Sequence, residues 1–189
     1  MSELSRRTFL AASGAALGAA WLNASPEQLD ASLVHAAIDD APLEVLTPEQ
    51  AADLDALTAQ IIPSDDLPGA REARVVAFID HSLATWAANQ KDFLIAGLTA
   101  WNGSVSQRYG GVQRFAQLTV DQQLEFLRAN DRNGFFQQIR FATIVGTFSN
   151  PANGGNFEKA GYRILGYDDR YVWQPPFGWY DDKANGGPN

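Results

Sequence analysis

The sequence predicts an all-α protein, a single helical bundle followed by an irregular C-terminal tail. Apolar residues recur three and four positions apart in several segments, which is the spacing that places them on one face of a helix. Threonine residues precede two of these segments at the position of a helix N-cap. No alternating apolar and polar run of useful length predicts a strand. These observations indicate helices packed on helices around one core.

The first helix is expected to begin after Thr47. Threonine is a good N-cap, Pro48 suits the first helical position, and Gln50 can return the capping hydrogen bond. Apolar residues then recur at helical spacing, namely Leu54, Leu57 and Ile61. Pro63 should end this helix.

Two further helices are predicted over residues 70–88 and 91–109. The apolar stripe of the first is formed by Val75, Phe78, Ile79 and Leu83, and that of the second by Phe93, Leu94, Leu98, Trp101 and Val105. The Gly110-Gly111 pair should stop the second helix, because glycine is a poor helix former.

The remaining helices are predicted to start near Thr119, at Phe135 and near Glu158. Thr119 and Gln122 repeat the capping-box spacing. The helix over 135–148 is followed by an Asn- and Gly-rich loop, Asn150–Asn156, and by a short helix ending near Leu165. The domain of helices should therefore span residues 47–166.

The N-terminus has the layout of a twin-arginine export signal. Arg6 and Arg7 are followed, after Thr8, by Phe9 and Leu10 and then by a weakly apolar stretch rich in Ala and Gly. That stretch is shorter than the roughly 20 residues that span a bilayer. We expect residues 1–24 to be the signal, residues 25–46 to be a linker with a short helix possible over 26–37, and the protein to work in the periplasm.

The net charge and the absence of cysteine exclude several classes of partner and cofactor. Removing residues 1–24, which carry a net charge of +1, changes the charge of the chain from −8 to near −9. A surface this acidic argues against nucleic acid and anionic lipid as partners. The chain has no cysteine, which excludes disulfides, iron–sulfur clusters and a C-x-x-C-H haem site.

The sequence offers little for catalysis. It has no dinucleotide-binding glycine motif and no P-loop, and adjacent Asp pairs such as Asp65-Asp66 are typical of turns and helix caps. Asp80 and His81 are neighbours on a predicted helix, where they face different ways. A structural histidine is favoured over a catalytic one. We therefore expect no catalytic, cofactor-binding or metal-binding residue in this chain.

The C-terminal segment, residues 167–189, has no helical period and is rich in Pro and aromatic residues. Its aromatic side chains surround Pro175-Pro176 and include Tyr171, Trp173, Phe177, Trp179 and Tyr180. So much aromatic surface either folds back on the bundle or docks on another protein, where Trp and Tyr are frequent anchors. Both alternatives remain open from the sequence.

Three groups of residues, in this order, resemble the gluconate 2-dehydrogenase subunit 3 family. They are Thr47–Gln50 with Ile61-Ile62-Pro63, then Leu67–Ala70 with Phe78–Asp80, then Thr143–Phe148 with Pro151, Gly154-Gly155-Asn156 and Gly161-Tyr162. The resemblance covers residues 44–167. It implies the small gamma subunit of membrane-bound flavin-dependent sugar or polyol dehydrogenases.

The resemblance implies partners that fit the absence of catalytic motifs. A large FAD-dependent subunit of the glucose–methanol–choline type would oxidise the substrate, and a multihaem cytochrome c subunit would pass electrons to the inner membrane. The small subunit would carry the twin-arginine signal, read by the twin-arginine translocase at Arg6, Arg7, Phe9 and Leu10, and escort the flavoprotein. Contacts with the flavoprotein are expected from Asn153, Gly154, Gly155 and Asn156 and from the aromatic tail.

Two other functions compete with this hypothesis. A self-sufficient exported enzyme would use Asp80, His81 and loop carboxylates, and should show turnover in the purified chain. A free-standing periplasmic binding domain would be a stable monomer with its aromatic tail buried on itself.

Overall fold

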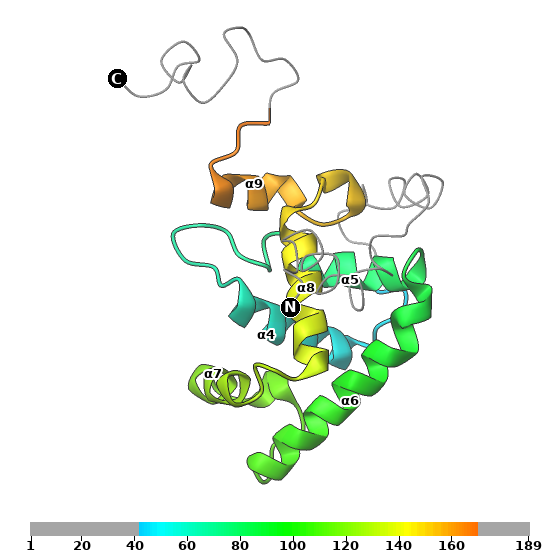
Figure 1. Ribbon diagram of the computed structural model, residues 1–189, viewed down its shortest axis with the longest axis vertical. Helices are drawn as coiled ribbons and strands as arrows, with labels where there is room; N and C mark the ends of the chain where they lie inside the picture. The colour runs from blue at the N-terminus through cyan, green and yellow to red at the C-terminus, as the bar shows by residue number, and fades with distance from the viewer. Residues whose placement is uncertain (1–41, 170–189) are drawn as a thin grey trace, which may run out of the picture.

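The computed structural model describes residues 42–169. The signal residues and the aromatic tail residues named above lie outside this range. Every regular element of the described part is a helix, which confirms the predicted all-α class. Figure 1 shows α8 running through the middle of the molecule, with α9 at its C-terminal end and α7 towards its N-terminal end.

The helices of the first half follow the sequence pattern closely, except that the helix predicted over 70–88 is shorter at both ends. Helix α4 spans Pro48–Ile61, α5 spans Val75–Ala84 and α6 spans Lys91–Arg108, after a short 3-10 turn η1 at Ala88–Gln90. Thr47 caps α4 with the predicted reciprocal bonds to Gln50. Helix α5 begins five residues later than predicted because Arg74, at its N-cap, has a left-handed backbone with φ of 54°.

The second half contains α7 at Val120–Ala129, α8 at Gly134–Phe148 and α9 at Ala160–Leu165. The 3-10 turn η2 at Phe115–Gln117 precedes α7, and two further 3-10 turns, η3 at Pro151–Asn153 and η4 at Phe157–Lys159, lie between α8 and α9. Thr119 caps α7 through the predicted capping box, whereas Asn133 caps α8 by accepting from the N–H groups of Phe135 and Phe136. The start of α8 at Gly134 agrees with the expected start within one residue.

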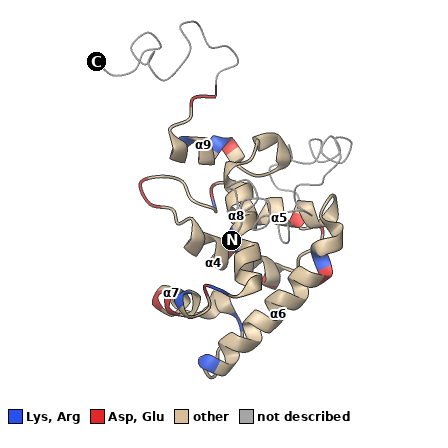
Figure 2. Cartoon of the chain, viewed as in Figure 1, with Lys and Arg blue, Asp and Glu red and all other residues tan. Residues whose placement is uncertain are grey.

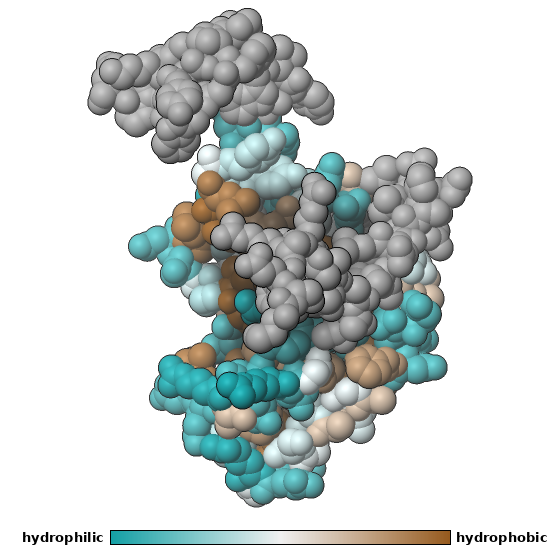
Figure 3. Space-filling model, in the orientation of Figure 1, coloured by the Kyte–Doolittle hydropathy of each residue, from teal (hydrophilic) through white to brown (hydrophobic). Residues whose placement is uncertain are grey.

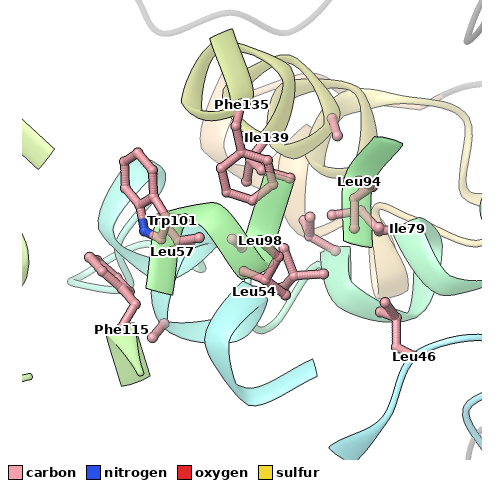
Figure 4. Packing of buried hydrophobic residues seen from close by; sticks show 14 of the residues in the cluster. Leu46, Leu54, Leu57, Ile79, Leu94, Leu98, Trp101, Phe115, Phe135 and Ile139 are labelled. Atoms are coloured by element: carbon pink, nitrogen blue, oxygen red, sulfur yellow. The ribbon is translucent and has the colours of Figure 1, made fainter. Parts of the chain in front are cut away.

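The core is one cluster in which α8 packs against α4, α5, α6 and α9, and α4 also packs against α5 and η2. Trp101 of α6 stands among aromatic rings, with centroid distances of 5.0 Å to Phe126 and 5.6 Å to Phe135. Figure 4 shows Trp101 and Phe115 at one side of this cluster and Leu94 and Ile79 at the other. Leu46 is buried as well, so the last residues of the segment expected to be a linker pack against the bundle.

A buried carboxylate fastens η2 to the bundle. Asp53 of α4 is 1% exposed and accepts hydrogen bonds from the Asn102 amide and from the backbone N–H of Ala116. The Asn102 carbonyl oxygen accepts from the N–H of Phe115. Buried carboxylates are tolerated where both oxygens have donors, so Asp53 holds α4, α6 and η2 in one arrangement.

Within residues 42–169, no helix combines the length and the apolar character that crossing a bilayer requires.

Candidate functional site

Two loops that are far apart in the sequence meet at the C-terminal end of α8 (Figure 1). The N–H of Phe157 donates to the carbonyl of Ala73 at 3.3 Å, and the N–H of Asn156 donates to the carbonyl of Gly146 at 2.6 Å. We call residues 67–74 and 150–162 the loop junction. Most of the residues that carry the family resemblance lie in it or pack against it, although they come from separate parts of the chain.

The loop junction contains every non-glycine residue between 42 and 169 that has a positive φ. These residues are Arg74, Asn156, Glu158 and Lys159, with φ between 49° and 60°. A left-handed conformation costs about 1–2 kcal/mol for an ordinary side chain. Such strain persists only where the surrounding packing imposes it, and it tends to gather at functional sites. The concentration of strain makes this junction the first candidate for a functional site.

Glycines allow the two loops and α8 to approach with backbone against backbone. A Cβ atom on Gly155 would lie 2.2 Å from the carbonyl oxygen of Gly146, and one on Gly161 would lie 1.9 Å from that of Thr147. Both separations are far below any real Cβ contact, and the obstructing atoms belong to the main chain. Gly155 and Gly161 are therefore required for the fold itself.

Asn156 is the central hydrogen-bonding side chain of the junction. It is fully buried, its amide donates to the Ser149 carbonyl at 2.8 Å, and its carbonyl oxygen accepts from the Gly161 N–H at 2.7 Å. The family motif predicts that Gly155 and Asn156 contact a partner, but both residues are buried in the interior of the loop. Asn153 and Gly154 are half-buried and keep an accessible surface.

Arg74 connects the two loops through an aromatic ring. Its guanidinium lies 3.5 Å from the centre of the Phe157 ring, a distance at which a cation–π attraction operates. The sequence did not predict a role for either residue. No local pattern marks an arginine with a left-handed backbone, and its aromatic partner is distant in the chain. The contact closes the side of the junction that faces α5.

Exposed apolar side chains lie in the loop junction and beside it. Leu67 is 48% exposed, Leu165 is 63% exposed and Ile144 of α8 is 37% exposed. Figure 3 shows apolar surface beside α9, on the side of the loop that joins α4 to α5. Apolar surface gathered next to a strained and specific loop structure is typical of protein–protein contact sites.

The start of the C-terminal tail is fixed at this same end of the molecule. The N–H of Tyr167 donates to the Tyr162 carbonyl at 2.8 Å, and the two rings contact edge to face with centroids 5.0 Å apart. Lys159 forms an ion pair with Asp169 at 3.0 Å. The aromatic tail, whose own residues 170–189 are outside the described range, therefore leaves the bundle beside the loop junction.

The carboxylate of Glu72 organises the first loop of the junction. It accepts hydrogen bonds from the Ser64 hydroxyl at 2.6 Å and from the Gly69 N–H at 2.7 Å. The Ser64 bond first, and the Gly69 bond second, lower the pKa of Glu72 below the ordinary value of 4.5. Because the folded pKa is depressed, the stabilisation is present above the unfolded pKa and is lost as pH falls through the folded pKa.

We expect Ser64→Ala to raise the pKa of Glu72 towards 4.5, because the strongest donor to the charged carboxylate is removed. Titration of the Glu72 side chain by NMR would measure the change. The matched control is Ser104→Ala, since the Ser104 hydroxyl only donates to the carbonyl of Ala100 in its own helix. An unchanged Glu72 titration in Ser64→Ala would contradict the assigned hydrogen bond.

Asp80 and His81, the residues of the competing enzyme hypothesis, occupy structural positions. The carboxylate of Asp80 accepts from the backbone N–H groups of Glu44, Val45 and Leu46 at 2.7–3.0 Å. His81 Nδ1 lies 3.1 Å from Glu44 Oε1, and the His81 side chain is 10% exposed. The pair thus fastens residues 44–46 to α5, which is the structural role that the sequence favoured for His81.

The described residues bring no group of three or more His, Cys, Asp or Glu side chains together in a way that could hold a metal ion.

Comparison with known proteins assigns the chain to a family. Residues 48–168 match the family described as gluconate 2-dehydrogenase subunit 3. No curated protein and no solved structure matches the chain. The family match covers more than half of the chain and includes every described helix and the whole loop junction. The chain therefore belongs to the gluconate 2-dehydrogenase subunit 3 family, the small subunits of dehydrogenase complexes.

Proposed function

We propose that this chain is the non-catalytic small subunit of a periplasmic FAD-dependent sugar or polyol dehydrogenase, and that it acts in maturation and twin-arginine export of the flavoprotein subunit. The observation that carries the proposal is the family match together with the twin-arginine signal. FAD belongs to the large subunit, and haem c to a cytochrome subunit. The twin-arginine route carries folded cargo. A flavoprotein that binds FAD in the cytoplasm and has no signal of its own could use the signal of its small subunit to cross the membrane in the folded state.

The contact with the flavoprotein is proposed at the loop junction and the tail that leaves beside it. Asn153 and Gly154 lie on the loop surface, and Leu67 and Leu165 supply apolar contact area nearby. Tyr171, Trp173, Phe177, Trp179 and Tyr180 follow in the tail and supply aromatic anchors of the kind that dominate binding energy at interfaces. The burial of Asp80 in a structural role removes the main support for an independent enzyme.

Replacing both signal arginines by lysine is the direct test. In cells that express both subunits, Arg6→Lys with Arg7→Lys should leave small subunit and flavoprotein in the cytoplasm, because the translocase reads the arginine pair. Dehydrogenase activity and FAD content of the periplasmic fraction, with immunoblots of both subunits, are the measurements. Periplasmic activity should fall to background.

The matched control is Arg71→Lys with Arg108→Lys, which replaces two exposed arginines of the folded domain and keeps their charge. It should export normally. Flavoprotein that reaches the periplasm with its FAD despite the altered signal, or in the absence of the small subunit, would show that the escort role is wrong.

A further inference from the structure

A groove with an apolar floor and a cationic rim lies between α4, α7 and α8. Its volume is about 510 Å³, and its floor includes Ile61, Leu124, Leu127 and Phe136. A volume of this size lies within the range of about 300–1,000 Å³ that is typical of ligand-binding pockets. The groove is distinct from the loop junction, which is at the opposite end of α8.

Three arginines line the rim of this groove. They are Arg128 of α7, Arg132 of the following turn and Arg140 of α8, against a single carboxylate, Asp131. Among residues 42–169 these three arginines form no ion pair, whereas Arg71 and Arg108 each have a carboxylate partner. Figure 2 shows that most of α8 is uncharged, and Arg140 is its one charged residue.

The charge of the groove is opposite to that of the chain. The whole sequence carries a net charge of −8, yet three exposed arginines, Arg128, Arg132 and Arg140, lie here around apolar side chains. Arginine is enriched at protein interfaces, where its fork of donors pairs with carboxylates. Grooves between helices commonly bind an amphipathic segment, whose apolar face packs against the apolar residues of the groove.

The groove is connected to the loop junction along one face of α8. Ile144 lies four residues after Arg140 and Phe148 four residues after Ile144, so all three side chains project from the same side of the helix. Ile144 is 37% exposed and Phe148 is half-buried. The 15 residues of α8 extend for about 22 Å. A partner bound at the loop junction can therefore extend along this face of α8 to the groove, so that both contacts belong to one continuous interface.

We infer that the groove between α4, α7 and α8 binds an acidic amphipathic segment of the flavoprotein subunit. The segment places apolar side chains on Ile61, Leu124 and Phe136 and its carboxylates on Arg132 and Arg140. This inference rests on the proposed function, since it names a second contact with the same partner. Charge complementarity of this kind accelerates association and makes it dependent on salt.

The test measures binding of the purified flavoprotein subunit to the purified full-length small subunit by interferometry at low and high salt. Arg132→Glu with Arg140→Glu should weaken binding at least about tenfold and remove most of its salt dependence. The matched control, Lys91→Glu with Thr99→Glu and Ser104→Glu, changes the net charge by the same amount at exposed positions of α6, away from the groove. It should bind as the unaltered subunit does. Thermal unfolding of each free variant verifies its fold.

The outcomes separate the two proposals. If the unaltered subunit does not bind the flavoprotein, the proposed function is wrong and this inference with it. If it binds and the groove variant binds equally well, the groove has no role and the proposed function stands.

The occupant is identified in the complex with a zero-length cross-linker that joins amines to carboxylates. Arg132→Lys keeps the charge of the rim and supplies an amine. A cross-link from residue 132 to a flavoprotein carboxylate supports the inference. A cross-link to acidic residues 27–40 of the same chain, or to a second copy of it, would overturn it.

Discussion

Replacing Gly161 by alanine is expected to destabilise the subunit by about 3 kcal/mol, the upper end for overpacking a well-packed site. The added Cβ would lie 1.9 Å from the carbonyl oxygen of Thr147, and neither neighbour can rotate away because the obstruction is main chain. Relief requires α9 to move off α8, which would break the bond from Gly161 N–H to the Asn156 side chain. Urea unfolding of the purified subunit would measure the loss, which corresponds to a Tm lower by roughly 10 °C.

Gly103→Ala is the matched control. Gly103 is an exposed residue within α6, and nothing lies within 4 Å of the added Cβ. Alanine is favoured over glycine inside a helix by roughly 0.5–1 kcal/mol, so this substitution should stabilise. Equal responses of the two variants would mean that α9 and α8 are not in backbone contact, and the packing of the loop junction would have to be revised.

Asp80→Ala is expected to cost about 3 kcal/mol of stability. The substitution leaves the N–H groups of Glu44, Val45 and Leu46 without their acceptor, and hydrogen bonds to a charged group contribute about 1.5–3 kcal/mol each. Because Glu44 is exposed, water can replace the lost acceptor for part of this segment. The expected loss of stability is therefore smaller than the sum of the three hydrogen-bond contributions. Asp80→Asn should be intermediate, since its amide keeps one acceptor oxygen.

Unfolding and hydrogen exchange together test this anchor. The amides of residues 44–46 should exchange much faster in Asp80→Ala, whereas amides in the middle of α6 should change only with global stability. Asp66→Ala, at an exposed loop carboxylate, should alter stability by less than about 0.5 kcal/mol. If Asp80→Ala has the same free energy of unfolding as the unaltered chain and the amides of residues 44–46 remain protected, Asp80 does not hold that segment. A catalytic role for Asp80 would then have to be tested.

The sequence predicted the helices because their signals are local. Thr47 with Gln50 and Thr119 with Gln122 specify helix starts through bonds that span three residues, and the structure shows both capping boxes. The apolar spacing of residues 135–148 identified α8 within one residue at its start. Such signals need no knowledge of what packs against the helix, so they can be read from the chain alone.

The loop junction and the groove could not be predicted in this way. The family motif containing Gly154, Gly155 and Asn156 was visible, but whether each residue faces a partner or the interior depends on Gly146 and Ser149 of another segment. The late start of α5, at Val75 instead of Ala70, has the same origin, because Arg74 adopts its left-handed backbone where the two loops meet.

The sequence alone determined the fold class, the approximate positions of the helices and the family resemblance, and it predicted an export signal, because each depends on residues close together in the chain or on their order. Only the tertiary structure decided that Asp53 and Asp80 are anchors, that Asn156 is buried, and that Arg128, Arg132 and Arg140 share one groove. The physical reason is that the burial of a side chain and its hydrogen-bond partners depend on which distant segments pack against it, and the local sequence does not specify those segments.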